Sequence, residues 1–197
     1  MLTDVKMTDP ASLRQAIRIL HETYRVPHVV ISSIPLKGWL KDFLPAPLRP
    51  PSDSSDTDYL ACIASSRQGN TVHIACFPCL PGYFSGVGDL FSALVLAHFD
   101  DTAAQETAEG ETPLSRAASL AVSKTHAILS LTHEAALALP EDERQATDEE
   151  LDAREPMRKI RRMRGRELRL IQGQDIIRGT QSIDYRGLRP WERFWDA

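Results

Sequence analysis

The sequence predicts an α/β protein in which helices cover a sheet of buried strands. A short apolar run at residues 28–32 is bounded by Pro27 and two serines, as expected for a buried strand. Two further apolar runs, 59–64 and 71–77, are joined by a Ser-Ser-Arg-Gln-Gly-Asn turn signal. A helical pattern precedes the first run and others follow the last run, and this order is typical of a layered α/β fold.

The first helix is expected to begin at Asp9 and Pro10, a favourable N-cap followed by a favourable first helical residue. Val26-Pro27 ends it, because the residue before a proline is disfavoured in helical conformation. At helical spacing, the inner face comprises Leu13, Ala16, Ile17, Leu20 and Tyr24.

Residues 34–57 predict a loop, because repeated prolines and a polar run disfavour both a helix and a central strand. Within it, the apolar cluster at 39–44 is compatible either with packing on the body of the protein or with a lid. The sequence does not decide between these two.

The second strand of the hairpin alternates, so Val72, Ile74 and Cys76 share one face and His73 lies on the other. His73 is interpreted as an ordinary surface or edge histidine. Cys76 and Cys79 form a CxxC pair, but a structural zinc site needs a second pair of ligands, which the sequence lacks. No metal site formed by protein side chains is therefore predicted.

The segment from Tyr83 to Phe99 organises the candidate site. Its Ser-Gly-Val-Gly turn delivers Asp89 at the start of a helical run in which Leu90, Ala93, Leu94 and Ala97 are expected to form the buried face. The first N–H groups of a helix lack intrahelical partners and favour negative charge, so this turn is suited to phosphate oxygens. A carboxylate there can take a proton from an attacking hydroxyl group. The alternative is that Asp89 only caps the helix.

The remainder of the chain reads as one long helix followed by charged segments. After an acidic loop at 100–111, a helix is expected from Pro113 to the residue before Pro140. Residues 141–156 are acidic and 157–166 are basic, which indicates either a solvated charged connector or a nucleic-acid contact. Residues 167–172 alternate as a final strand would. Packing is the only role that the sequence suggests for the last residues, 185–195.

Composition limits the classes of protein to consider. The chain has 197 residues, a net charge of −4 and three cysteines. It is long enough for one ordinary core, has too few cysteines for a disulfide scaffold and is not basic enough for a dedicated nucleic-acid binder. It shows neither a membrane-spanning apolar run nor a signal-peptide core, so a cytoplasmic location is expected.

Three strings resemble motifs of a known family. Gly86-Val-Gly-Asp-Leu-Phe-Ser-Ala-Leu94 resembles the anion-hole and catalytic-base motif of ribokinase-like kinases, and within them of pyridoxal kinases. Pro27-His-Val-Val-Ile-Ser-Ser33 and Glu167-Leu-Arg-Leu-Ile-Gln172 resemble two pyridoxal kinase strands, in the same order. The resemblance covers about residues 7–178. It implies a ribokinase-like three-layer α/β/α sandwich that is incomplete and contains only the C-terminal, ATP-side half of the domain.

The resemblance also implies a reaction, the ATP-dependent phosphorylation of the 5′-hydroxymethyl group of pyridoxal, with Mg²⁺ bridging the phosphates. Asp89 would accept the proton, and Gly86, Val87 and Gly88 would form the anion hole, with Gly88 toward the substrate. A monovalent cation would lie near Ser32 and Ser33. ATP would contact Ser32, Ser33, Leu80, Pro81, Gly82 and Val87.

The organisation implied is a kinase part at 1–175, with flexible insertions near 34–57, 100–112 and 141–166, and a tail at 176–197. Members of the family form homodimers and act on ATP and pyridoxal, and no membrane partner is implied. Two departures weaken the match: Val87 stands where the family usually has threonine, and the Asn-x-x-Glu motif of the substrate half is not found. The chain is therefore expected to be a truncated form with little activity alone.

Two alternatives stay open. The first is a related vitamin or sugar kinase of the same fold. The second is a truncated, inactive interaction protein that uses its basic segment at 157–166.

Overall fold

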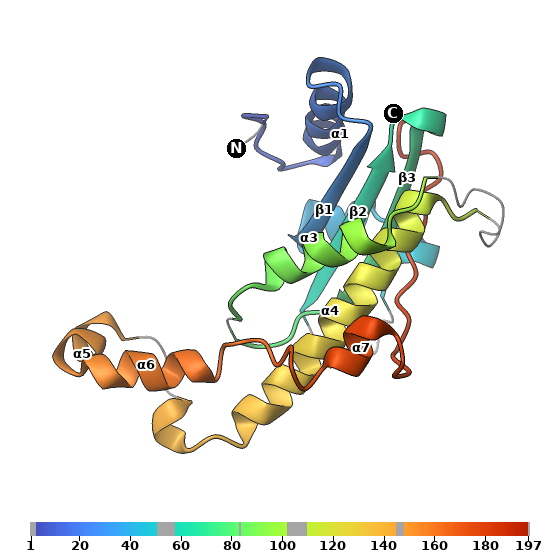
Figure 1. The fold of residues 1–197 in the computed structure, drawn as a ribbon. Helices are drawn as coiled ribbons and strands as arrows, with labels where there is room; N and C mark the ends of the chain where they lie inside the picture. Colours follow the sequence, from blue (N-terminus) through green and yellow to red (C-terminus); the bar gives the residue numbers. More distant parts are fainter. Residues whose placement is uncertain (1–2, 51–57, 83, 102–109, 145–147, 197) are drawn as a thin grey trace. The chain divides into compact units, whose positions relative to one another are not determined.

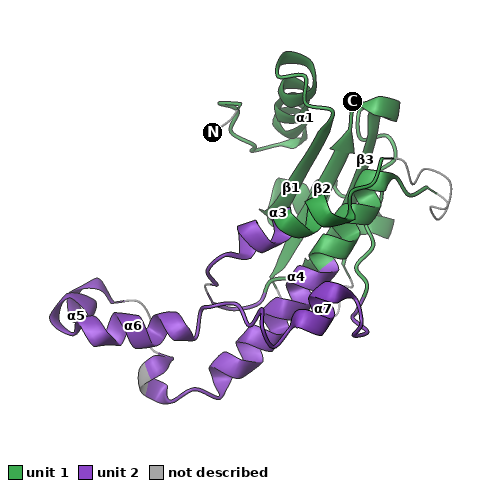
Figure 2. Ribbon diagram, viewed as in Figure 1, with its two compact units in different colours: residues 1–79, 93–122, 185–197 green, residues 80–92, 123–184 purple. Residues whose placement is uncertain are grey.

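The computed structural model describes residues 3–50, 58–82, 84–101, 110–144 and 148–196. The chain divides into two compact units, shown in Figure 2. The first comprises residues 1–79, 93–122 and 185–197, and the second comprises residues 80–92 and 123–184. Two long helices, α3 (Val87–His98) and α4 (Pro113–Leu137), each contribute to both units.

The first unit is built on an antiparallel sheet (Figure 1). Its strands are β1 (His28–Pro35), β2 (Tyr59–Ser66), β3 (Thr71–Pro78) and β4 (Arg189–Pro190), in the order β1-β2-β3-β4. The short helix η3 (Gln68–Asn70) joins β2 to β3, and Gly69 there takes a left-handed φ of 73°. The strand and the hairpin expected from the sequence are therefore confirmed.

The N-terminal helix α1 (Pro10–Arg18) begins as expected. The Asp9 carboxylate accepts a hydrogen bond from the Ser12 amide at 2.7 Å, and the Ser12 hydroxyl oxygen accepts one from the Asp9 amide at 3.1 Å. A π-helical turn, η1 (Ile19–Thr23), then follows. Its wider turn shifts the inner face, so His21 is buried and Tyr24 is 59% exposed. The placement of Tyr24 on the inner face was wrong for this reason.

One face of the sheet carries the main hydrophobic core. Two short helices, α2 (Trp39–Phe43) and η2 (Ala46–Leu48), lie in the stretch that was expected to be a loop. Residues 36–48 fold because their leucines are buried in the core, and so the 39–44 cluster packs on the body. The fully or almost fully buried members of this core are Leu13, Ile17, Leu36, Leu40, Leu44, Leu48, Ala61, Ile63, Val72, Ile74, Trp191 and Phe194.

The C-terminal residues belong to the same core. Trp191 and Phe194 are 4% and 1% exposed, and Arg14 donates a hydrogen bond from its Nε atom to the Phe194 carbonyl oxygen. The Arg14 guanidinium also lies 5.0 Å from the centre of the Phe43 ring. These contacts fix the chain end onto the sheet.

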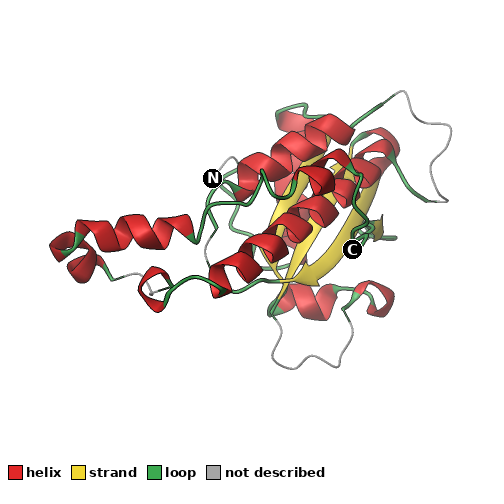
Figure 3. Cartoon of the chain, turned by 60° about the horizontal axis from the view of Figure 1, so that its bottom comes forward, coloured by secondary structure: helices red, strands yellow, loops and turns green. Residues whose placement is uncertain are grey.

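The opposite face of the sheet is covered by helix segments of the same unit. His28 contacts Phe99 just after α3, and the Leu188 amide donates to the Ser119 hydroxyl oxygen of α4 at 2.8 Å. Figure 3 shows the strands between helices on both sides. Helix, sheet and helix layers of this kind agree with the α/β/α sandwich expected from the sequence.

The second unit is mainly helical. It contains the C-terminal part of α4, η4 (Glu141–Glu143), α5 (Glu149–Arg154), α6 (Pro156–Arg164) and α7 (Gln174–Arg178). Of the charged stretch predicted at 141–166, we call residues 148–166 the charged segment, and this segment is not a plain solvated connector. It folds because Arg158 and Arg162 both donate hydrogen bonds to Asp152.

The strand expected at 167–172 is wrong. In the described chain, Glu167 alone makes an isolated parallel bridge, to Ser85. The following residues turn onto α4 instead: the Arg169 amide donates to the Thr132 hydroxyl at 3.1 Å, and a Cβ on Gly173 would lie 2.1 Å from the Ile128 side chain. Alternation alone could not reveal that a helix, and not a neighbouring strand, receives this segment.

No helix in the described ranges is both long and apolar enough to cross a membrane.

Candidate functional site

The turn before α3 has the backbone geometry expected for anion binding. Gly86 takes a left-handed φ of 82°, and the Leu90 amide donates to the Gly86 carbonyl oxygen at 3.0 Å. This is the first hydrogen bond of the helix. The N–H groups of Val87, Gly88 and Asp89 therefore have no acceptor within the helix. A Cβ added to Gly86 or Gly88 would meet no atom within 4 Å, so open space lies in front of these residues. We call residues 86–89 the anion turn.

Asp89 lies in the first turn of α3 and its side chain is exposed. The helix begins at Val87, so Asp89 does not occupy the N-cap position. Among the residues that the structure describes, none forms a hydrogen bond or ion pair with the Asp89 carboxylate. This carboxylate is therefore accessible to a ligand at the helix end.

The buried face of α3 differs from the predicted one. Phe91 and Leu94 are buried, Leu90 is half-buried, and Ala93 and Ala97 are exposed. The difference has a simple cause, because burying the large Phe91 ring removes more apolar surface from water than burying an alanine.

A second segment holds the anion turn from one side. The Ser85 amide donates to the Arg166 carbonyl oxygen at 2.9 Å, next to the bridge between Ser85 and Glu167. The preceding residue, Phe84, meets His133 of α4 edge-on, with ring centres 6.5 Å apart.

These contacts surround a cavity of about 300 Å³, which we call the Phe84 cavity. Pro81, Gly82 and Phe84 line it from the chain before the anion turn, and His133 lines it from α4. Its remaining lining residues are Ala136, Leu137, Leu139, Glu143, Arg144, Arg162, Gly165 and Arg166. A mostly apolar wall with aromatic rings and guanidinium groups suits a flat ring system that carries an anionic group.

An ion cluster supports one wall of this cavity. Arg162 donates to both carboxylate oxygens of Asp152, with Nη1 2.7 Å from Oδ1, and Arg158 donates to Oδ1 as well. The Asp152 and Arg162 side chains are 10% and 4% exposed. Hydrogen bonds from Arg162, and secondarily from Arg158, lower the pKa of Asp152 from 3.8 to about 2.

The predicted site residues belong to two different units. Leu80, Pro81 and Gly82 and the anion turn belong to the second unit, where Pro81 and Gly82 line the Phe84 cavity. Ser32 and Ser33 belong to the first unit.

The two serines also differ locally from expectation. They do not end β1, which continues to Pro35. They lie where the register with β2 shifts between Ile31 and Ile34, and Ser33 is exposed. A bulge of this kind changes the direction of side chains and is frequent near functional sites.

Sequence reasoning missed the side chains that line the Phe84 cavity from α4 and from the charged segment. His133 and the basic run were visible in the sequence. An acidic stretch next to a basic run could have indicated that the two pair. In the structure Arg158 and Arg162 of the basic run donate hydrogen bonds to Asp152, so residues that seemed solvated form a folded element.

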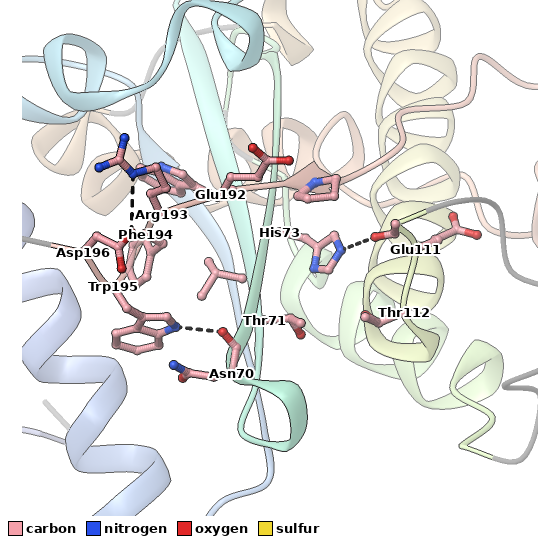
Figure 4. A pocket seen from close by; sticks show the side chains of 14 residues that line it. Asn70, Thr71, His73, Glu111, Thr112, Glu192, Arg193, Phe194, Trp195 and Asp196 are labelled. Atoms are coloured by element: carbon pink, nitrogen blue, oxygen red, sulfur yellow. Dashed lines mark hydrogen bonds and ion pairs between the residues drawn. The ribbon is translucent and has the colours of Figure 1, made fainter.

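The first unit has a larger cavity of about 570 Å³, drawn in Figure 4. His73 lines it and is only 3% exposed, so its interpretation as a surface histidine was wrong. Its Nε2–H donates to the Gly110 carbonyl oxygen at 2.8 Å, and burial lowers its pKa. None of the predicted site residues lines this cavity. The described residues contain no group of three or more His, Cys, Asp or Glu side chains that could hold a metal ion.

Comparisons with known proteins agree with the resemblance read from the sequence. The Schizosaccharomyces pombe protein named putative pyridoxal kinase C6F6.11c is 26% identical over 146 residues, which are 73% of this chain and 42% of that protein. The Saccharomyces cerevisiae protein named putative pyridoxal kinase BUD16 is 33% identical over 84 residues, 43% of this chain and 21% of that protein. No family model matches the chain.

Among solved structures, a pyridoxal kinase from Leishmania donovani in complex with ADP and pyridoxamine aligns with a TM-score of 0.57 and 20% identity. The alignment covers 96% of this chain and 47% of that one. The resemblance to pyridoxal kinases is therefore confirmed, and the chain shares the fold of about half of this solved pyridoxal kinase. The chain spans less than half the length of the curated relatives that it matches.

Proposed function

We propose that this chain forms the nucleotide-binding part of a pyridoxal kinase, which transfers the γ-phosphoryl group of ATP to the 5′-hydroxymethyl group of pyridoxal. One observation carries the proposal. The accessible carboxylate of Asp89 lies at the start of a helix whose first N–H groups have no acceptor within the helix. This is the arrangement that phosphoryl transfer requires of the protein, namely positioning and charge stabilisation. The ADP complex of the similar Leishmania structure supports it.

The proposed step conserves atoms and charge. The substrate hydroxyl oxygen forms a bond to the γ-phosphorus, and the bond from that phosphorus to the β,γ-bridging oxygen breaks as ADP leaves. Asp89 accepts the hydroxyl proton. The amides of Gly86, Val87 and Gly88 stabilise the negative charge on the transferring oxygens, and the valine in place of threonine removes one hydroxyl from this set.

Three further features belong to the same proposal. Mg²⁺ would be held chiefly through the nucleotide phosphates, since the described residues provide no cluster that would enclose it. Ser32 and Ser33 would contact the nucleotide and a monovalent cation. Leu80, Pro81, Gly82 and Val87 would also contact the nucleotide, with Gly88 toward the substrate.

The proposal also extends to location and assembly. We propose that the kinase acts in the cytoplasm and forms homodimers. A chain that spans about half of the similar kinases is expected to show little turnover alone.

Nucleotide binding is the first test, and it needs only the 197-residue chain. ADP at about 100 times its dissociation constant should stabilise the folded state by about 2.7 kcal/mol. Thermal unfolding with and without ADP measures this shift. Asp89→Asn should show the same shift, because the proposed role of Asp89 is proton transfer and not nucleotide binding. An unchanged melting temperature for the wild-type chain at millimolar ADP would reject the proposal.

Catalysis is the second test. In a kinase that contains this chain together with the rest of the length of its relatives, Asp89→Asn should lower kcat by a factor of about 10² to 10⁴. The KM for ATP should change little. Normal turnover in this variant would refute the role of Asp89. Robust formation of pyridoxal 5′-phosphate by residues 1–197 alone would refute the expectation of low activity.

The interaction-protein alternative has one observation in its favour, since Lys159, Arg161 and Arg164 are exposed on α6. Arg158 and Arg162 in the same helix, however, are engaged with Asp152, so fewer cations face outward than the sequence suggested. Salt-sensitive nucleic-acid binding that is lost when these three residues are replaced by glutamine would support the alternative.

A further inference from the structure

We infer that the charged segment, residues 148–166, forms a wall of the nucleotide site on the side of the base, and that Asp152 is the positioning residue that holds this wall. The inference rests on the proposed function, because it assigns the Phe84 cavity to the base of the nucleotide whose phosphates meet the anion turn. Its evidence is a chain of contacts within the second unit.

The first contact fixes the outer side of the wall. Asp152 is at the middle of α5, and its two oxygens accept hydrogen bonds from Arg162 on α6. Paired hydrogen bonds between a guanidinium and a carboxylate set the plane of the arginine side chain as well as its position. Arg158 adds a further bond to the same carboxylate. The side chains that form this cluster are 4% to 10% exposed, so the cluster is held inside the unit.

The second contact fixes the end of α6 against α4. Gly165 follows the helix, and a Cβ built there would lie 3.0 Å from Leu139 Cδ1 and 3.9 Å from the Ala136 side chain. Glycine therefore allows the backbone to approach α4 closely. Leu139, Ala136 and Gly165 all line the Phe84 cavity, so this close approach brings α4 and the end of the wall together at the cavity.

The third contact joins the wall to the anion turn. Arg166 lines the cavity, and its carbonyl oxygen accepts the Ser85 amide hydrogen at 2.9 Å. Gly86, the first residue of the anion turn, follows directly. The wall is thus fixed at Asp152 on one side and next to the phosphate-binding amides on the other.

Part of the wall suits the face of a flat ring, and Arg144 and Arg166 add guanidinium groups to the same cavity. The Arg162 charge is balanced by Asp152, so this residue contributes a flat and positioned surface and not a free cation. Such a guanidinium plane stacks on ring faces. Phe84 and His133 supply aromatic surface in the same cavity. A heterocyclic base is the part of a nucleotide that matches this lining, while the phosphates match the anion turn.

The two parts of the ligand can be tested separately with ADP and inorganic pyrophosphate. Pyrophosphate carries the phosphate charge without a base, so it reports on the anion turn alone. Isothermal titration of the 197-residue chain gives both dissociation constants. We expect Asp152→Asn to weaken ADP binding about tenfold, which corresponds to about 1.4 kcal/mol, and to leave pyrophosphate binding unchanged or slightly tighter. The ratio of the two constants is the readout, because general loss of structure would weaken both ligands together.

Two further variants complete the experiment. Asp58→Asn is the matched control, since Asp58 forms an exposed ion pair with Lys37 at 3.2 Å in the first unit, and both constants should stay at their wild-type values. Gly165→Ala moves the wall without changing a charge, and it should reduce ADP binding more than pyrophosphate binding. If Asp152→Asn unfolds α5 and α6, Gly165→Ala decides the result.

The outcomes separate the inference from the function that it rests on. If the wild-type chain binds neither ligand, the proposed function fails. If it binds both and Asp152→Asn or Gly165→Ala weakens both equally, the assignment of the wall to the base is refuted. Binding of ADP by Asp152→Asn at wild-type strength would refute it as well.

Discussion

The Ser85 amide nitrogen lies 2.9 Å from the Arg166 carbonyl oxygen, and this hydrogen bond joins two segments that are far apart in the sequence. One segment continues into the anion turn and α3, and the other directly follows the end of α6. The arrangement makes the charged segment part of the same unit as Asp89. A change in α6 can therefore reach the proposed phosphate-binding amides through a single residue, Ser85.

The two glycines of the anion turn should respond differently to alanine. Gly86 has a φ of 82°, which costs an L-amino acid about 1 kcal/mol, although the space around it is open. Gly88 has no such φ, lies inside α3 and is equally open, so Gly88→Ala should be neutral or stabilise the helix by up to about 1 kcal/mol. Urea unfolding of both variants measures the difference. Equal destabilisation by the two substitutions would contradict the assigned turn geometry.

Acid should loosen the charged segment. The folded-state pKa of Asp152 is lowered from 3.8 to about 2, so its carboxylate stabilises the fold above pH 4 and that contribution is lost as the pH falls from about 4 toward 2. Helical circular dichroism and the free energy of unfolding should decrease over this range. Asp152→Asn should lack this component of the pH dependence. The same acid profile in the variant and the wild type would rule out the ion cluster as its source.

Much of the first unit follows from local sequence patterns. The start of α1 is specified by Asp9, Pro10 and Ser12. The hairpin of β2 and β3 is specified by the connection that contains Gly69. These signals act over a few residues, and so the sequence alone predicts them. The anion turn and its carboxylate belong to the same class, because the glycines and Asp89 are adjacent in the chain.

What could not be predicted depends on contacts between distant residues. The alternation at 167–172 is real, but this segment meets Thr132 of α4 and not a partner strand. The charged segment appears solvated until Asp152 is seen to engage two arginines. His73 is buried and donates a hydrogen bond to the distant Gly110 carbonyl oxygen, and nothing near His73 in the sequence shows this.

The C-terminal residues should be required for stability of the first unit. Phe194 is 1% exposed and contacts Trp191 and Trp195 at ring-centre distances of 4.9 and 4.8 Å. Phe194→Ala should therefore lower the free energy of unfolding by about 3 to 5 kcal/mol. Tyr24→Ala is the control, because Tyr24 is 59% exposed and should cost about 0.5 kcal/mol or less. Chemical denaturation compares them, and a similar cost for both would show that the chain end is not part of the core.

The buried His73 should make the stability of the first unit depend on pH near neutrality. Burial lowers the pKa of His73 below 6.5, against the opposing effects of its hydrogen bond to Gly110 and the charge of Glu111. Below pH 6.5 the unfolded chain binds a proton that the folded chain disfavours, so the free energy of unfolding falls as the pH decreases, by at most about 1.4 kcal/mol per pH unit. His73→Gln keeps a donor for the Gly110 carbonyl oxygen and removes the titration, so its stability should change less between pH 7 and pH 5. Urea unfolding at a series of pH values tests this, and a wild-type stability that rises as the pH falls through 6.5 would contradict a buried, neutral His73.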